Sequence, residues 1–150
     1  MRFTLSSSAL SSKLSALSKV INSKNALPIL GDFVFDIQGQ ELKLTASDSE
    51  NTMRTSLQLA DSDSDGRFAI GNHDLLEAVK GFSEQPITFD VNSEQNIVKI
   101  SYQNGLFSLP IENADEYPVT QAINGSINTI ILPNTILAEN INRSIFATAQ

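Results

Sequence analysis

An apolar pattern recurs along the chain at an offset of 65 residues, and this repeat limits the folds that the chain can adopt. In each copy a strand residue precedes polar cap residues, and apolar residues then follow at the spacing of a helix. The first copy comprises Leu5, Leu10, Leu14 and Leu17, and the second comprises Ile70, Leu75, Val79 and Phe82. A third copy, 62 residues after the second, begins at Leu132 and continues with Leu137 and Ile141. Such self-similarity indicates one supersecondary unit that is used repeatedly.

The first two copies each continue into about three segments with strand character. Helices are predicted for residues 6–22, capped by Ser6 to Ser8, and for a shorter segment capped by Asn72. Strands are predicted for residues 2–5, 29–37, 42–46, 52–59, 67–70, 87–91, 97–102 and 106–111. Gly39 lies between two of them, where a short hairpin turn favours a residue that tolerates positive φ. The first helix should end near Lys24, because Pro28 disfavours helical backbone just before it.

These elements predict an α+β protein with a duplicated β-α-β-β-β unit, whose helices lie on one side of curved antiparallel sheets. We expect residues 1–120 to form one domain. Residues 121–150 are expected to form a linker followed by the opening strand and helix of a second, truncated domain. A domain that lacks its sheet cannot bury the apolar face of that helix well.

Charge is distributed unevenly along the chain, whose net charge is −7. The first acidic residue is Asp32, and the preceding segment carries Arg2, Lys13, Lys19 and Lys24, a local charge of +4. The polar face of the first helix is rich in serine and lysine and contains no acid. Such a face suits an anionic partner such as nucleic acid, while the acidic remainder of the protein would repel it. An ordinary solvated helix face explains the same residues equally well.

The composition excludes several kinds of site. Cysteine is absent, which removes disulfides, thiolate nucleophiles and zinc–sulfur sites and is compatible with a reducing cytoplasm. His73 is the single histidine, and without a cysteine or a second histidine it does not make a metal site. The spacing of serines and acids around it does not nominate a Ser-His-acid triad. Asp48 and Glu50 form an acid pair near a strand end, but no base accompanies them. No apolar run approaches the roughly 20 residues of a membrane span. We therefore expect a cytoplasmic protein with no catalytic residues, no metal and no cofactor.

Residues 61–66, Asp-Ser-Asp-Ser-Asp-Gly, match the first half of an EF-hand calcium loop. The twelfth position is Asn72, where the loop needs a bidentate glutamate, and the flanking segments have strand character. A polar hairpin tip is the better interpretation. The alternative function is a non-catalytic, β-rich, calcium-stabilised binding module, which predicts that calcium increases stability.

Four segments, at residues 26–31, 46–50, 106–118 and 132–150, resemble segments that occur in the same order in the bacterial sliding clamp, the β subunit of DNA polymerase III. Residues 26–31, Ala-Leu-Pro-Ile-Leu-Gly, are similar to the family's TLPIL segment, and residues 46–50, Ala-Ser-Asp-Ser-Glu, resemble one of its strand ends. Residues 106–118 are similar to the segment that closes the family's first domain. Residues 132–150, a turn and a helix, resemble the start of its second domain. The resemblance covers the whole chain.

The resemblance implies a DNA-clamp fold and a role as a processivity factor. In the family, three such domains form a crescent, and two crescents join head to tail into a homodimeric ring around duplex DNA, with helices lining the hole. Contacts with the DNA must be weak and indifferent to sequence, because a strong or base-specific contact would stop sliding. The implied partners are double-stranded DNA, a second copy of the protein, DNA polymerase III and the clamp loader, the last two through regions mostly absent from this chain. No membrane partner is implied.

The resemblance also implies particular contacts with DNA. Lys24 falls where the family has a basic DNA-contacting residue just before its TLPIL segment. Gln150 falls on a glutamine in a loop that touches DNA in the hole. Lys80 matches a basic position on the second helix. His73 and Asp74 stand where the family often has two basic residues, so no contact is expected there.

Three further DNA contacts, Lys13, Lys19 and Arg143, are predicted from charge and helical position alone. Phe107 and Leu109 share one face of the last predicted strand. The resemblance implies that these two residues pack against the third domain of the neighbouring subunit in the ring. An ordinary core strand is the other interpretation of the same pair.

Overall fold

The computed structural model describes residues 1–22, 27–48, 50–118 and 129–148. The chain divides into two compact units, Met1–Thr120 and Gln121–Gln150. The helices of the first unit are α1 (Ser7–Leu17) and α2 (Asn72–Lys80), with short 3-10 turns η1 (Pro28–Gly31) and η2 (Ala114–Glu116). Its strands are β1 (Arg2–Ser6), β2 (Asp32–Gln38), β3 (Glu41–Ser47), β4 (Thr52–Gln58), β5 (Asp61–Ser62), β6 (Gly66–Gly71), β7 (Pro86–Asn92), β8 (Ile97–Tyr102) and β9 (Gly105–Glu112). The eight strands predicted within this unit are therefore confirmed, with shifts at their ends, of which the largest is at residues 29–31, where η1 replaces the predicted start of β2. The short strand β5 was not predicted.

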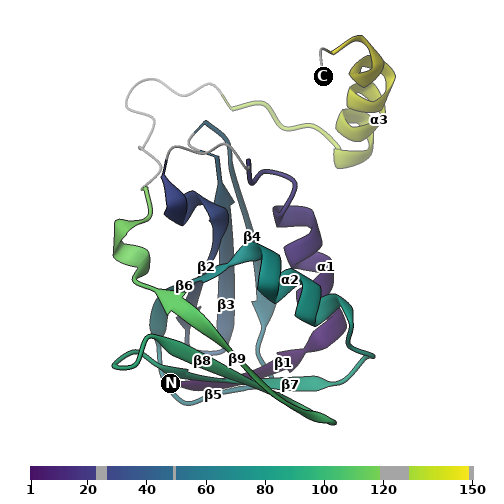
Figure 1. The fold of residues 1–150 in the computed structure, drawn as a ribbon. Coiled ribbons are helices and arrows are strands. Elements are labelled where there is room, and N and C mark those ends of the chain that lie inside the picture. Colours follow the sequence, from purple (N-terminus) through teal and green to yellow (C-terminus); the bar gives the residue numbers. More distant parts are fainter. Residues whose placement is uncertain (23–26, 49, 119–128, 149–150) are drawn as a thin grey trace. The chain divides into compact units, whose positions relative to one another are not determined.

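These strands form one sheet with the order β4-β3-β2-β6-β9-β8-β7-β1-β5, in which neighbouring strands are antiparallel. Each copy of the repeat contributes three consecutive strands to one half of the sheet and its first strand to the other half. Figure 1 shows that the two halves run in different directions. They meet where β6 pairs with β9 through two residue pairs, Ala69–Glu112 and Ile70–Ile111. The two copies are therefore interlocked by exchanged strands.

The two helices α1 and α2 pack side by side on one side of this sheet (Figure 1). Their buried residues include Leu10 and Leu14 on α1, and Leu75 and Val79 on α2. These positions are related by the offset of 65 residues, so the repeat in the sequence is a repeat of core positions. The structure confirms the predicted α+β class, with its helices on one side of antiparallel sheets.

Four phenylalanine rings form the centre of the core beneath the helices. The rings of Phe3 on β1 and Phe89 on β7 stack with their centroids 4.9 Å apart. The rings of Phe35 on β2 and Phe68 on β6 stack with their centroids 5.2 Å apart. Contacts of 6.4 Å between Phe3 and Phe68, and of 5.9 Å between Phe35 and Phe89, join the two pairs. Each stacked pair combines one ring from each copy, so this cluster holds the exchanged strands together.

The hairpin between β2 and β3 has the predicted turn. The strands pair up to Gln38 and Glu41, which leaves Gly39 and Gln40 as a two-residue loop. Gly39 has φ +59°, a conformation that glycine adopts without the steric cost that a Cβ introduces. Its N–H donates a hydrogen bond of 2.7 Å to Asp65 Oδ1, which ties the turn to the segment before β6.

The first helix is shorter than predicted, since α1 ends at Leu17 instead of continuing to about residue 22. After α1, the N–H groups of Lys19, Val20 and Ile21 donate hydrogen bonds to the carbonyls three residues before them. This part of the chain therefore forms successive turns instead of a continued α-helix. Ser18 Oγ also donates to Ser15 O at 3.1 Å. Such serine-to-backbone bonds compete with the helical ladder and account for the early end of α1.

The prediction that Asn72 caps the second helix is wrong. The residue at the N-cap is Gly71, and no side chain caps α2. Asn72 instead uses its side-chain amide to donate a hydrogen bond to the carbonyl of Gly31, at the end of η1. A tertiary hydrogen bond from this amide therefore replaces the local capping bond that the sequence predicted.

Residues 61–66 do not form the hairpin tip that their composition suggested. Asp61 and Ser62 form β5, which pairs with β1 in the other half of the sheet, and the chain then returns to β6. Asp63 Oδ1 accepts hydrogen bonds from the Arg2 N–H at 2.8 Å and from Ser64 Oγ at 2.7 Å. The segment is a crossing between the two halves, and its acids serve as acceptors for backbone groups.

In the second unit the described residues form α3 (Asn134–Ser144) and the 3-10 turn η3 (Ile145–Ala147). Among the described residues, the strand predicted before this helix is not observed, since residues 129–133 have no regular structure. A strand needs a hydrogen-bonding partner, which β7 provides for β1 in the first unit. None of the residues of α3 is buried.

Candidate nucleic-acid interface

Serine side chains fix the start of α1. The Ala9 N–H donates to Ser6 Oγ at 3.1 Å, which is the predicted N-cap. The buried Ser7 Oγ donates to Ser83 O at 2.8 Å and accepts from the Gln85 N–H at 3.0 Å. These bonds attach α1 to the segment between α2 and β7, so the two helices are held in a fixed relation.

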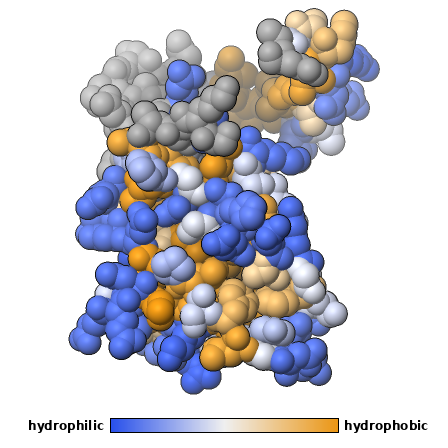
Figure 2. Space-filling model, in the orientation of Figure 1, coloured by the Kyte–Doolittle hydropathy of each residue, from blue (hydrophilic) through white to orange (hydrophobic). Residues whose placement is uncertain are grey.

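Three of the predicted DNA contacts lie on this pair of helices. Lys13 is half-buried on α1, and Lys19 is exposed in the turns that follow α1. Lys80 is exposed in the last turn of α2, where a cation complements the helix dipole. The surface over this helical side is largely hydrophilic (Figure 2). The packing of α1 against α2 thus brings the three lysines to one side of the sheet.

The charge of this side is not uniform. No acidic residue occurs on α1, whereas Asp74 and Glu77 are exposed on α2. His73 Nδ1 lies 3.1 Å from Asp74 Oδ1, and both side chains are largely exposed. Positive charge is therefore concentrated on α1 and at the end of α2, while the start of α2 is acidic.

The other three predicted contacts lie outside the described part of the first unit. Lys24 and Gln150 lie outside the described residues. Arg143 occupies the last turn of α3 in the second unit. Those three residues remain predictions from the sequence.

The predicted subunit-contact residues lie on a partly open strand. Phe107 and Leu109 are half-buried on β9 and pack against the core. The Phe107 ring lies 5.9 Å from that of Phe82 and 6.3 Å from that of Tyr102. Among the described residues, β9 pairs with β8 along its length but with β6 only at Ile111 and Glu112. Residues 105–110 therefore present an unpaired strand edge, which is a ready template for another strand.

The remaining acidic candidates have structural roles. Asp48 Oδ1 accepts hydrogen bonds from the Asn51 N–H at 2.7 Å and the Glu50 N–H at 3.1 Å, and the bonds from Asn51 lower the pKa of Asp48 most. Within the described residues no group of three or more His, Cys, Asp or Glu side chains could hold a metal ion. The calcium-stabilised module is therefore not supported.

One cluster of cations was missed in the sequence. Lys43, Arg54 and Arg67 line a pocket on the side of the sheet opposite the helices. Each occupies a polar position of an alternating strand, which is the one signal that could have indicated a shared face. The strand order, which places β6 beside β2, was needed to bring them together.

A β-α-β-β-β unit used twice, with exchanged first strands and both helices on one side of an antiparallel sheet, defines a DNA-clamp domain. The chain belongs to the family of the DNA polymerase III beta subunit, because the model of that family's N-terminal domain matches residues 1–121.

Individual relatives agree with this assignment. The beta sliding clamp of Pseudomonas aeruginosa is 26% identical over 150 residues, covering 100% of this chain and 40% of that protein. The beta sliding clamp of Synechocystis is 25% identical over 156 residues, covering 99% of this chain and 39% of that protein. The crystal structure of the P. aeruginosa DNA polymerase III subunit beta has a TM-score of 0.87 at 26% identity, over 100% of this chain and 40% of that one. A Helicobacter pylori beta clamp bound to a DNA ligase peptide shares the fold, with a TM-score of 0.76 at 23% identity over 83% of this chain and 34% of that one. The chain thus spans about two fifths of the length of the P. aeruginosa and Synechocystis relatives and about a third of the H. pylori chain.

Proposed function

We propose that this chain is the first domain, residues 1–120, and the opening of the second domain, residues 121–150, of a sliding clamp. The complete protein would form a head-to-tail homodimeric ring around duplex DNA and would hold a replicative polymerase on its template by topology. It would act in the cytoplasm as an accessory subunit without a catalytic site. The family match over residues 1–121 is the observation that carries this proposal.

The helical side of the first unit supports a role facing DNA. Lys13, Lys19 and Lys80 can interact with phosphates without reading base edges, which suits a ring that has to slide. Serine hydroxyls around Lys13 on α1 add hydrogen-bond donors without adding negative charge. The few cations and the acids at the start of α2 limit the strength of such contacts. Lys24, Arg143 and Gln150 are proposed as additional contacts.

The open edge of β9 supports a role in ring closure. We assign Phe107 and Leu109 to the contact with the neighbouring subunit, since both are only half-buried in their own unit. The H. pylori relative was solved with a DNA ligase peptide. By analogy, peptides of the polymerase and of the clamp loader would bind the complete protein, through regions mostly beyond this chain. None of the helices among the described residues has the length and apolar character to cross a membrane.

The DNA-facing role can be tested on this chain by NMR titration with two duplexes of unrelated sequence. We expect equal, salt-sensitive binding to both, with a Kd on the order of 10⁻⁴ M or weaker. Amide shifts should concentrate on α1 and the end of α2. A Lys13→Glu, Lys19→Glu double variant should abolish them, whereas Lys99→Glu, at an exposed position on β8, should not. Sub-micromolar affinity, a preference for one sequence, or equal loss in the Lys99 control would contradict the proposal.

A further inference from the structure

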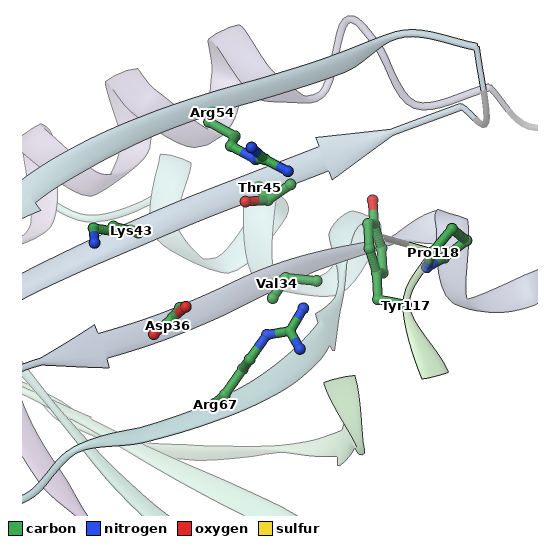
Figure 3. Close-up of a pocket in the computed structure, with 8 residues that line it drawn as sticks. All are labelled: Val34, Asp36, Lys43, Thr45, Arg54, Arg67, Tyr117 and Pro118. Carbon is green, nitrogen blue, oxygen red and sulfur yellow. The ribbon is translucent and has the colours of Figure 1, made fainter. Parts of the chain in front are cut away.

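A second cationic site lies on the outer side of the sheet, opposite α1 and α2. Its cavity has a volume of about 330 Å³, near the lower end of the roughly 300–1,000 Å³ that small-molecule sites occupy. The pocket is lined by Val34 and Asp36 on β2, Lys43 and Thr45 on β3, Arg54 on β4, Arg67 on β6, and Tyr117 and Pro118 beyond η2. Figure 3 shows these side chains rising from one face of the strands.

The strand register explains why the charges gather there. Asp36 pairs with Lys43 on one side and with Arg67 on the other, so three charged side chains form a row across β3, β2 and β6. In the next row Thr45 pairs with Arg54. Three cations and one carboxylate give the pocket a formal charge of +2. That charge complements a dianion.

Lys43 and Arg67 keep most of their positive charge available, because their partners are neutral or largely exposed. Lys43 Nζ donates to the neutral Gln38 Oε1 at 3.3 Å. Arg67 Nη1 lies 3.9 Å from Asp115 Oδ1, but the Asp115 side chain is 80% exposed and the pair is correspondingly weak. Arg54 and Arg67 also carry planar, multi-donor heads, which match the oxygens of a phosphate.

A buried hydroxyl belongs to the same wall. Tyr117 is 3% exposed, and its hydroxyl makes no hydrogen bond of normal geometry among the described residues. Burial raises the pKa of Tyr117 to about 12, so the phenol keeps its proton at neutral pH and is a hydrogen-bond donor. The hydroxyl points toward the strands that carry Thr45 and Arg54 (Figure 3). The backbone N–H of Ser47 acts on this hydroxyl as a donor, so the phenol O–H itself is left to donate, and an anion in the pocket would accept that hydrogen bond.

We propose that this pocket binds a phosphate dianion, either free phosphate or the phosphate of a small phosphomonoester. Arg54, Arg67 and Lys43 would neutralise the charge, and the hydroxyls of Thr45 and Tyr117 would donate hydrogen bonds. A phosphomonoester carries close to two charges at neutral pH, whereas each phosphate of a DNA backbone carries one. The site therefore differs from the DNA-facing helices in ligand as well as in position, and it does not depend on the proposed clamp function.

The test is an NMR titration of this chain with sodium phosphate at constant ionic strength, with sodium chloride as the exchanged salt. We expect saturable shifts at the amides of β2, β3, β4 and β6 that line the pocket. Arg54→Gln should weaken binding by about tenfold or more, as expected for loss of a hydrogen bond between charged groups. Tyr117→Phe should weaken it severalfold while the fold is retained. Lys99→Gln removes the same charge from β8, outside the pocket, and should leave the affinity unchanged.

The source of the phosphate is distinguished by a parallel titration with O-phosphoserine. Tighter binding of O-phosphoserine assigns the pocket to phosphomonoesters, and equal or weaker binding assigns it to free phosphate. The proposal is overturned if no saturable shift occurs at these strands. It is also overturned if Arg54→Gln and Lys99→Gln weaken binding equally, or if Tyr117→Phe binds with full affinity.

Discussion

The four-ring cluster predicts that Phe89→Ala is among the most destabilising single changes in this protein. Phe89 is fully buried and lies against two other rings, 4.9 Å from Phe3 and 5.9 Å from Phe35. Truncating a buried phenylalanine to alanine costs about 3–5 kcal/mol, from lost transfer free energy and from the cavity left behind. A domain of this size is stabilised by roughly 5–15 kcal/mol, so the variant should lose a large part of its free energy of unfolding.

Urea unfolding, monitored by circular dichroism, measures this loss of free energy. In a separate thermal melt, Tm should fall by about 10–20 °C. Leu106→Ala is the control, because Leu106 is 59% exposed and its truncation should change stability by no more than about 0.5 kcal/mol. Phe89→Leu fills part of the cavity and should fall between the two. A loss below about 1 kcal/mol in Phe89→Ala would refute the claim that the rings hold the exchanged strands together.

Further predictions concern the turn, a buried acid and a helix cap. Gly39→Ala should destabilise the protein by about 1 kcal/mol through backbone strain alone, since Gly39 has φ +59° and an added Cβ would meet nothing within 4 Å. Gly31→Ala, at an equally open position without left-handed backbone, should be neutral or slightly stabilising, and equal urea midpoints for the two variants would contradict the argument. Burial raises the pKa of Asp32 from 3.8 to about 6, so the folded state binds the extra proton and stability should fall as the pH rises through that interval. Asp32→Asn should remove this dependence of stability on pH and should raise the free energy of unfolding by about 1 kcal/mol at pH 7, after allowance for partial solvent exposure. Asp90→Asn, on the surface, should keep the dependence. An unchanged pH dependence in Asp32→Asn would count against the assignment. Ser6→Ala should cost about 1 kcal/mol in urea unfolding through loss of the N-cap bond, and a variant as stable as the parent would show that the cap contributes nothing.

The repeat and the strand segments could be predicted from the sequence because each depends on local periodicity. Leu10, Leu14, Leu75 and Val79 are buried as their spacing required, since an amphipathic helix has one face that avoids water. The turn at Gly39 was equally local, because a two-residue hairpin loop needs a residue that accepts positive φ.

The errors arose where a tertiary partner outweighed a local preference. Asn72 has the composition of an N-cap, but its amide is used by the Gly31 carbonyl on a distant turn. Asp63 and Asp65 have the spacing of calcium ligands, but they accept hydrogen bonds from the backbone of Arg2 and Gly39. These partners depend on the exchange of strands between the two halves of the sheet, which periodicity does not reveal.

The outer pocket was missed for a related reason. Lys43, Arg54 and Arg67 are separated by up to 24 positions in the sequence and lie on three strands. Alternation places each on the outward face of its own strand. Only the order β4-β3-β2-β6 makes them neighbours, and that order depends on pairing between the first and second copies of the repeat.

The most direct test of the clamp assignment uses the full-length protein that contains this sequence. The protein is loaded onto nicked circular DNA by its clamp loader, and the retained fraction is measured before and after the circle is linearised. A ring that holds DNA by topology should remain on circles and slide off linear ends. Equal retention on both forms, or no retention on either, would contradict the account.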